Sequence, residues 1–111
     1  MEETRIYVGL RDRDSREQIY ETEKYKLMVK EICKEYRSPF SVTLMEGGYF
    51  HDDGTWVDEN SLMITLLSTP KDTVYKIARD VCKTFHQESV IIVIDKVISF
   101  NIHDKEKPNK R

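Results

Sequence analysis

The residues best suited to chemistry are concentrated in two short segments of the chain, residues 49–59 and residues 87–89. The first segment combines aromatic rings, an imidazole and carboxylates, and the second combines an amide, a carboxylate and a hydroxyl group. Such groups bind small polar molecules by ring stacking and by hydrogen bonding. We therefore predict a site for a small polar or anionic ligand between the two segments, made by Tyr49, His51, Trp56, Glu59, Gln87, Glu88 and Ser89.

Other kinds of chemistry find less support in the residue pattern. Asp52, Asp53 and Asp58 lie near His51, and oxygen ligands suit Mg²⁺ or Ca²⁺, but the spacing is not that of a calcium loop. Asp53-Gly54 is also what an ordinary hairpin turn requires. The sequence therefore predicts no metal and no cofactor, while leaving open a cation at this tip.

Nucleophilic catalysis is not indicated either. The chain has no Gly-x-Ser-x-Gly motif, and Cys33 and Cys82 fall on the apolar stripes of two expected helices. Such cysteines are typical of buried core thiols. No catalytic residue is predicted, and a non-enzymatic role is favoured.

Composition excludes several classes of protein. The chain has 111 residues, with 18 Lys+Arg against 20 Asp+Glu and a formal charge of −2. This is the length of one domain, and the balanced charge argues against nucleic acid as a partner. No apolar run approaches the roughly 20 residues that cross a membrane. The acidic opening leads directly into a strand pattern without a signal peptide, so we expect a cytoplasmic protein.

Periodicity predicts the elements that must position the site. Alternating or continuous apolar residues indicate strands, three- and four-residue spacing indicates helices, and Ser15 with Gln18 offers a capping box for an extra helical turn. Gly47-Gly48 predicts a bulge or a change of twist within the hairpin. The expected elements are strands 5–10, 40–45, 56–67 and 88–94, helices from 22 to before Pro39 and from Thr69-Pro70 to Phe85, and an additional strand at 97–102.

This order predicts a ferredoxin-like α+β sandwich with the order β-α-β-β-α-β, an antiparallel sheet with both helices on one face and a long hairpin between the second and third strands. Residues 1–103 would form the single domain, and 104–111 a disordered, polar, basic tail. The second sheet face is apolar, which predicts a homo-oligomer, a dimer or a trimer, formed through that face. Its residues include Met45, Met63, Leu67, Ile91 and Val93.

One family of nucleic-acid-binding proteins shares this order. The strand Ile6–Leu10 is similar to the first strand of an RNA recognition motif, whose third strand carries basic and aromatic residues that bind bases. Here residues 62–67 contain neither. We therefore predict that nucleic acid is not a partner.

Several pieces of the chain together resemble an uncharacterised bacterial family of small proteins, a domain of unknown function with a Tyr-Phe-Gly-Leu opening and a Gln-Glu-Ser-Val closing motif. The resemblance spans about residues 4–100, with Val8 in place of the phenylalanine and Tyr49-Phe50 in place of a Gln-Trp pair. It supports the fold, transfers no activity, and implies that Glu59, Gln87, Glu88 and Ser89 cluster. The matching pieces are Thr4-x-x-Tyr7-x-Gly9-Leu10, Val42-Thr43-Leu44-x-x-Gly47-x-Tyr49, Asp53-Gly54, Glu59-x-Ser61 and Phe85-x-Gln87-Glu88-Ser89-Val90.

Three classes of function remain open from the sequence. The favoured one is a self-associating module that binds a small molecule. The second is a protein–protein interaction module, of the kind that a phage or mobile element encodes. The third is a dimeric α+β-barrel enzyme in which His51, Tyr49 or Glu46 supplies acid–base chemistry. Nitrogen-regulator-like trimers share the fold order and carry nucleotides beside this hairpin, but the hairpin here lacks Arg and Lys, which disfavours phosphate.

Overall fold

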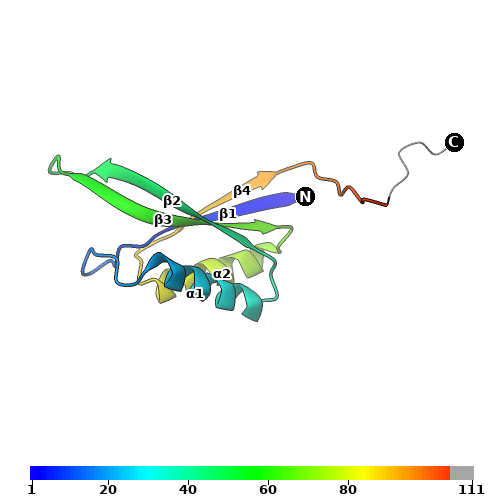
Figure 1. Ribbon diagram of the computed structural model, residues 1–111, viewed down its shortest axis with the longest axis horizontal. Coiled ribbons are helices and arrows are strands. Elements are labelled where there is room, and N and C mark those ends of the chain that lie inside the picture. The colour runs from blue at the N-terminus through cyan, green and yellow to red at the C-terminus, as the bar shows by residue number, and fades with distance from the viewer. Residues whose placement is uncertain (106–111) are drawn as a thin grey trace.

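The computed structural model describes residues 1–105 and confirms the ferredoxin-like α+β fold, with two helices on one face of a four-stranded antiparallel sheet (Figure 1). The strands are arranged in the order β2-β3-β1-β4. Both neighbours of the central strand β1 are therefore distant from it in sequence. The elements are β1 (Glu2–Gly9), α1 (Thr22–Glu35), β2 (Ser41–Phe50), β3 (Trp56–Leu67), α2 (Lys71–Thr84) and β4 (Ile91–Lys96).

The hydrophobic core lies between the sheet and the two helices. Alternate residues of β1 and β3 point toward the helices, because successive side chains of a strand face opposite sides. They meet apolar stripes along α1 and α2, and burying each large aliphatic side chain stabilises the fold by roughly 1.5–3 kcal/mol. Fully buried core residues include Ile6, Val8, Val29, Leu62, Ile64, Leu66, Val74, Ile77 and Val81.

The helices begin close to their predicted starts. Helix α1 starts at Thr22, with Glu21 as its N-cap residue, and α2 starts at Lys71, with Pro70 as its N-cap residue. The predicted helical turn at Ser15 is wrong. The Asp12 carboxylate instead accepts hydrogen bonds from the backbone N–H groups of Asp14 and Ser15, and such side-chain bonds compete with helix formation.

The β2–β3 hairpin is long and regular. Its register runs without interruption from Ser41 opposite Thr65 to Phe50 opposite Trp56, so of the two predicted alternatives at Gly47-Gly48 the bulge is wrong. Gly48 has a different role, because a Cβ there would lie 2.3 Å from the ring of Trp56. The turn uses Gly54 with a φ of 85°, as the Asp-Gly signal predicts.

The hairpin extends beyond the rest of the sheet. The ladder between β1 and β3 ends at Gly9 opposite Ser61, whereas β2 and β3 continue to pair as far as the turn. Residues 46–60 therefore project as a two-stranded ribbon, which we call the hairpin arm (Figure 1).

The end of the chain departs from the prediction. Strand β4 begins at Ile91 rather than at Glu88, and the additional strand predicted at 97–102 does not form within the described part of the chain. The backbone N–H of Val97 donates to the carbonyl of Met1 at 3.0 Å, after which the chain leaves the sheet (Figure 1). Of the tail predicted at 104–111, residues 106–111 lie outside the described residues.

Candidate functional site

The sheet face opposite the helices, which we call the open face, has no layer over it among residues 1–105. Its central strand carries Tyr7 and Gly9, and the β1 register places Tyr7 between Met63 of β3 and Ile91 of β4. Ile91 and Leu67 are exposed, and Met63 is half-buried. The structure thus leaves this face uncovered, with apolar residues on it beside the polar pair Arg5 and Thr65.

One carboxylate lies on the open face over a glycine. Gly9 pairs with Ser61 of β3, and Glu59 precedes Ser61 by two residues on the same strand. A Cβ built on Gly9 would lie 2.6 Å from Oε2 of Glu59. The missing side chain at Gly9 therefore makes the room that the Glu59 carboxylate occupies. The carboxylate borders a pocket of about 290 Å³, the open-face pocket, which is lined by Tyr7, Val8, Gly9, Met45, Glu59, Ser61, Gln87, Ser89, Val90 and Ile91.

A second pocket, of about 260 Å³, lies beside the open-face pocket and contains five of the seven predicted site residues. Tyr49 and His51 come from the hairpin arm, and their rings lie 5.4 Å apart in an edge-to-face arrangement. Gln87, Glu88 and Ser89 come from the connection between α2 and β4. Since Gln87 and Ser89 line both pockets, the two segments that the sequence predicts to cooperate do meet, and Glu59 joins them through the open-face pocket.

Trp56 takes no part in lining these pockets. Its ring packs against Phe50 with the ring centroids 5.0 Å apart, and its Nε1 donates to Oδ1 of Asp58 at 2.8 Å. It is 52% exposed on the hairpin arm. Trp56 is thus the predicted site residue that the structure places apart from the others.

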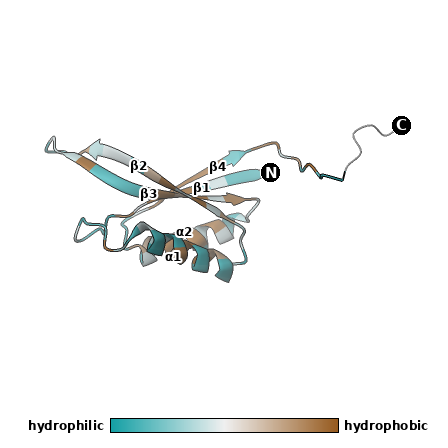
Figure 2. Ribbon diagram, viewed as in Figure 1, coloured by the Kyte–Doolittle hydropathy of each residue, from teal (hydrophilic) through white to brown (hydrophobic). Residues whose placement is uncertain are grey.

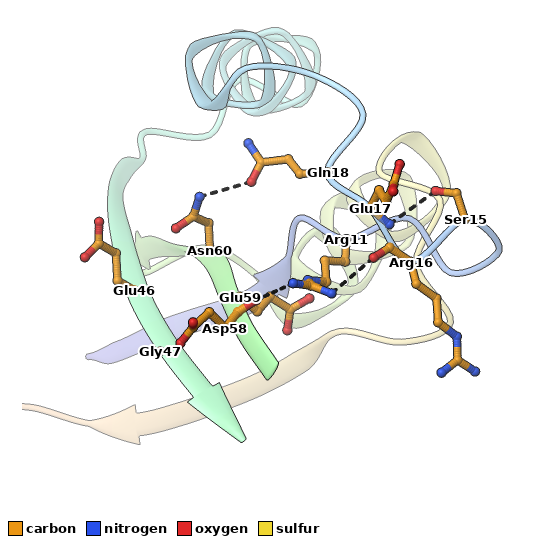
Figure 3. Close-up of a pocket in the computed structure, with 10 residues that line it drawn as sticks. All are labelled: Arg11, Ser15, Arg16, Glu17, Gln18, Glu46, Gly47, Asp58, Glu59 and Asn60. Atoms are coloured by element: carbon orange, nitrogen blue, oxygen red, sulfur yellow. Dashed lines mark hydrogen bonds between the residues drawn. The ribbon is translucent and has the colours of Figure 1, made fainter. Parts of the chain in front are cut away.

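Sequence reasoning missed the loop that forms the other wall of the site. Residues 11–18, which we call the arginine loop, bring Arg11, Arg13 and Arg16 to the second pocket. The Arg11 guanidinium donates to the carbonyls of Asp58, at 2.7 Å, and Arg16, at 3.2 Å, and so joins the loop to β3 (Figure 3). The hairpin itself has no Lys or Arg, but this loop supplies positive charge beside it.

The arginine loop and the hairpin arm also enclose an open, strongly polar pocket of about 650 Å³ (Figure 3). Asn60 of β3 donates to Gln18 across it at 3.1 Å. Its wall mixes guanidinium groups with carboxylates, a combination that suits a ligand bearing both charges. The lining residues are Arg11, Ser15, Arg16, Glu17, Gln18, Glu46, Gly47, Asp58, Glu59 and Asn60.

A histidine–aspartate pair fixes the arginine loop to the end of α2. Nδ1 of His86 lies 2.5 Å from Oδ1 of Asp12, whose other oxygen accepts the N–H groups of Asp14 and Ser15. The hydrogen bond from His86, helped by these two backbone bonds, lowers the pKa of Asp12 to about 2. The next residue, Gln87, donates from Nε2 to the carbonyl of Arg11 at 2.5 Å. The His86–Asp12 pair therefore keeps Gln87, a predicted site residue, next to the arginine loop.

Two groups have the composition of a metal site. Asp12, Asp14 and His86 place ligand atoms within 4.8 Å of one another, but Asp12 already accepts three hydrogen bonds. At the hairpin tip, Asp53 accepts the Thr55 N–H at 2.9 Å, and its hydrogen bonds with Thr55 lower its pKa. The carboxylates of Asp12 and Asp53 thus stabilise local structure through these hydrogen bonds.

Neither cysteine offers a nucleophile to the site. Both thiols are free, and burial raises the pKa of Cys33 to about 11, so its reactive thiolate is scarce at neutral pH. Cys82 is half-buried and donates from Sγ to the carbonyl of Gln87 at 3.2 Å. The prediction of a buried core thiol is confirmed for Cys33.

Fold and site together define a ferredoxin-like α+β protein with connected polar pockets beside the open face of its sheet. The chain belongs to the family described as Protein of unknown function (DUF3574), whose model matches residues 3–100. This confirms the resemblance to an uncharacterised domain family. A search of curated proteins gives no match. Among residues 1–105, no helix is both long enough and apolar enough to cross a membrane.

Solved structures extend the comparison. The chain is similar to a phage SAM lyase in its apo state, at 28% identity and a TM-score of 0.64, over 85% of this chain and 78% of that one. It is also similar to a phage SAM lyase in complex with S-methyl-5'-thioadenosine, at 27% identity and a TM-score of 0.63, over 86% and 80%. CutA1 from Oryza sativa shares the fold, at 13% identity and a TM-score of 0.60, over 91% and 84%.

Proposed function

We propose that this protein binds an S-adenosyl compound, a thioether or a sulfonium, in the open-face pocket beside Glu59. The observation that carries the proposal is the Glu59 carboxylate lying over Gly9 in the open-face pocket, whose residues Gln87 and Ser89 also line the second pocket beside the arginine loop. The likeness to a phage SAM lyase solved with S-methyl-5'-thioadenosine, at 27% identity, supports this class of ligand.

The groups around the pocket suit the parts of such a ligand. Tyr7, Met45 and Ile91 offer apolar and aromatic contacts for an adenine ring, and Gln87 and Ser89 offer hydrogen-bonding groups for ribose hydroxyls. A sulfonium is a cation, and a carboxylate nearby in a partly desolvated pocket attracts it. The Glu59 carboxylate is the acidic group that lines this pocket.

A ligand with an amino-acid end would extend into the neighbouring pockets. S-Adenosylmethionine ends in an ammonium and a carboxylate, and the walls around the arginine loop present both carboxylates and guanidinium groups. The guanidinium of Arg11 is fixed by its hydrogen bonds to two carbonyls. Arg16 takes part in this network through its backbone carbonyl and not through its guanidinium. We assign the ligand's carboxylate to this arginine-bearing wall.

Cleavage of S-adenosylmethionine is the second candidate function, favoured by the 28% identity to a lyase. The bond between the sulfur and the four-carbon amino-acid chain would break, and its electron pair would remain on S-methyl-5'-thioadenosine. As this bond breaks, its carbon would bond to the ligand's own carboxylate oxygen, or the adjacent carbon would give a proton to Glu59 and form a carbon–carbon double bond. Release of S-methyl-5'-thioadenosine, followed by mass spectrometry, tests this step separately from binding.

Self-association and location complete the proposal. The exposed side chains of Leu67 and Ile91 on the open face support a homo-oligomer, a dimer or a trimer, formed through that face. Such an assembly would also remove the open-face pocket from bulk water. The free thiols of Cys33 and Cys82 support a reducing, cytoplasmic location.

Isothermal titration with S-methyl-5'-thioadenosine and with S-adenosylmethionine tests the binding proposal. Glu59→Gln should weaken the cationic ligand by about tenfold or more and the neutral thioether by less, because only the sulfonium has a charge to attract. Asp52→Asn, at the exposed hairpin tip, is the matched control and should leave both affinities unchanged. Binding of neither compound to the wild-type protein would refute the proposal.

A further inference from the structure

The hairpin arm carries an unpaired strand edge. Strand β2 lies at the border of the sheet, so its outer edge has no strand partner among the described residues. The arm, residues 46–60, is a ribbon of only two strands. A ribbon of this kind is only marginally stable in water unless a further strand or layer supports it. Phe50 is 69% exposed near its end. The arm thus has both the edge and the apolar surface to accept a third strand.

The segment after β4 has the complementary features. Ile98, Phe100 and Ile102 alternate along residues 97–102 and are 97%, 81% and 81% exposed. In an extended chain this spacing places all three side chains on one side. The pattern is that of a strand with one buried face, and the apolar stretch beyond β4 shows partly brown in Figure 2. Residues 97–102 therefore have a strand sequence without a sheet in their own chain.

We propose that residues 97–102 of one copy of this protein pair as an added strand with the outer edge of β2, along the hairpin arm, of a second copy. The arm and the segment after β4 leave the molecule at opposite ends of its longest dimension, 67 Å, so they do not meet within one copy (Figure 1). The two surfaces are different parts of the chain, so each copy can give its C-terminal segment to one neighbour and receive a segment on its arm. Such contacts close either as a reciprocal dimer or as a ring of copies.

Charge favours a second copy as the occupant. The hairpin arm, residues 46–60, carries five acidic residues and no Lys or Arg. The C-terminal residues 96–111 carry five Lys and Arg against two Asp and Glu. Residues 97–102 carry no charge themselves, but the sequence that flanks them is basic where the arm is acidic, and opposite charge steers encounter and fixes orientation.

Side-chain types favour the same pairing. Aromatic residues directly across from β-branched residues are among the favourable cross-strand pairs. The arm exposes Tyr49, Phe50 and Trp56, and the C-terminal segment exposes two isoleucines and a phenylalanine. The added strand would cover apolar surface on both chains.

Native mass spectrometry of full-length variants tests the pairing. Ile98→Lys/Phe100→Lys changes the C-terminal segment, and Phe50→Lys changes the arm; each should raise the dissociation constant of the assembly by about tenfold or more. Leu27→Lys, which replaces a residue 58% exposed on α1, should leave it unchanged. Circular dichroism verifies that every variant is folded.

Mixing the two kinds of variant gives the sharpest result. The Phe50→Lys protein retains a normal C-terminal segment and the other variant retains a normal arm, so the mixture should form one-to-one pairs that neither variant forms alone. A monomeric wild-type protein, or an unchanged assembly of the C-terminal variant, would overturn the inference. If Ile91→Lys on the open face dissolves the assembly and the C-terminal variant does not, the strand pairing is wrong, while ligand binding by the wild type still stands.

Discussion

The carboxylate of Glu59 occupies the space that a side chain at Gly9 would fill, since a Cβ there would lie 2.6 Å from Oε2. This contact joins β1 to the base of the hairpin arm and places a negative charge on the open face. The neighbouring pocket residues Gln87 and Ser89 come from the connection between α2 and β4. The Glu59–Gly9 contact is therefore the centre of the proposed ligand site.

Replacing Gly9 by Ala tests this contact. The new methyl group would displace the end of the Glu59 side chain, which is flexible, so the fold should change in stability by less than about 1 kcal/mol. Titration should show that the affinity for S-adenosylmethionine falls by about tenfold. Leu27→Ala is the control, because Leu27 is 58% exposed on α1 and lines none of the three pockets. Equal affinities of the Gly9 and Leu27 variants would contradict the assigned role.

Gly48→Ala should destabilise the protein through the hairpin arm. A Cβ at Gly48 would lie 2.3 Å from the Trp56 ring and 2.9 Å from the Val57 carbonyl, which is backbone and yields little. We expect a loss of roughly 1–3 kcal/mol in the free energy of unfolding, measured with urea. The double variant with Trp56→Ala should recover part of it. A Gly48 variant as stable as Gly47→Ala, where nothing lies within 4 Å of a Cβ, would show that the ring moves away at no cost.

Acid should weaken the clamp between the arginine loop and α2. The pKa of Asp12 is about 2 in the fold against 3.8 for the free group, so its ionised form stabilises the fold above about pH 4, and this contribution is lost as the pH falls toward 2. Asp12→Asn should lower stability near neutral pH, with a difference from wild type that shrinks below pH 4. Asp52→Asn serves as the control, and a difference that is constant with pH would contradict the assignment.

The thiol of Cys33 should resist labelling in the folded protein. Its pKa of about 11 reflects burial, and only the thiolate reacts rapidly. Iodoacetamide treatment followed by peptide mass spectrometry should modify Cys33 after unfolding and only slowly before it. Because the folded pKa lies above the 9.0 of a free thiol, ionisation of Cys33 disfavours the fold, and stability should fall as the pH rises from 9 toward 11. Rapid modification at neutral pH would show that the core opens at this position.

Sequence periodicity was enough to predict the fold, because the core positions repeat with strand and helix spacing. Val74, Ile77 and Val81 mark α2, and Ile6 and Val8 mark β1; all five are buried. The additional strand at 97–102 was predicted from the same kind of pattern. A pattern of alternation shows that a segment suits a sheet but not whether a strand edge lies beside it, and β4 ends at Lys96 without continuing into this segment.

The candidate site could be predicted only in part. Tyr49, His51 and Gln87 stood out by their chemistry, and the fold brings them to one pocket. The arginine loop has no periodicity, so its place depends on long-range bonds such as that from Arg11 to the Asp58 carbonyl. The role of Gly48 in making room for the Trp56 ring could not be predicted, because the close approach of the two residues is a property of packing.

Amide chemical-shift mapping by NMR, with S-methyl-5'-thioadenosine added to the wild-type protein, tests the central claim most directly. We predict that the largest changes fall on the amides of Gly9, Ser61, Gln87 and Ser89, which surround the open-face pocket. Glu59→Gln measured in the same way should retain this pattern at higher ligand concentration. Changes confined to the hairpin tip around Asp52, or no saturable change at any amide, would contradict the account.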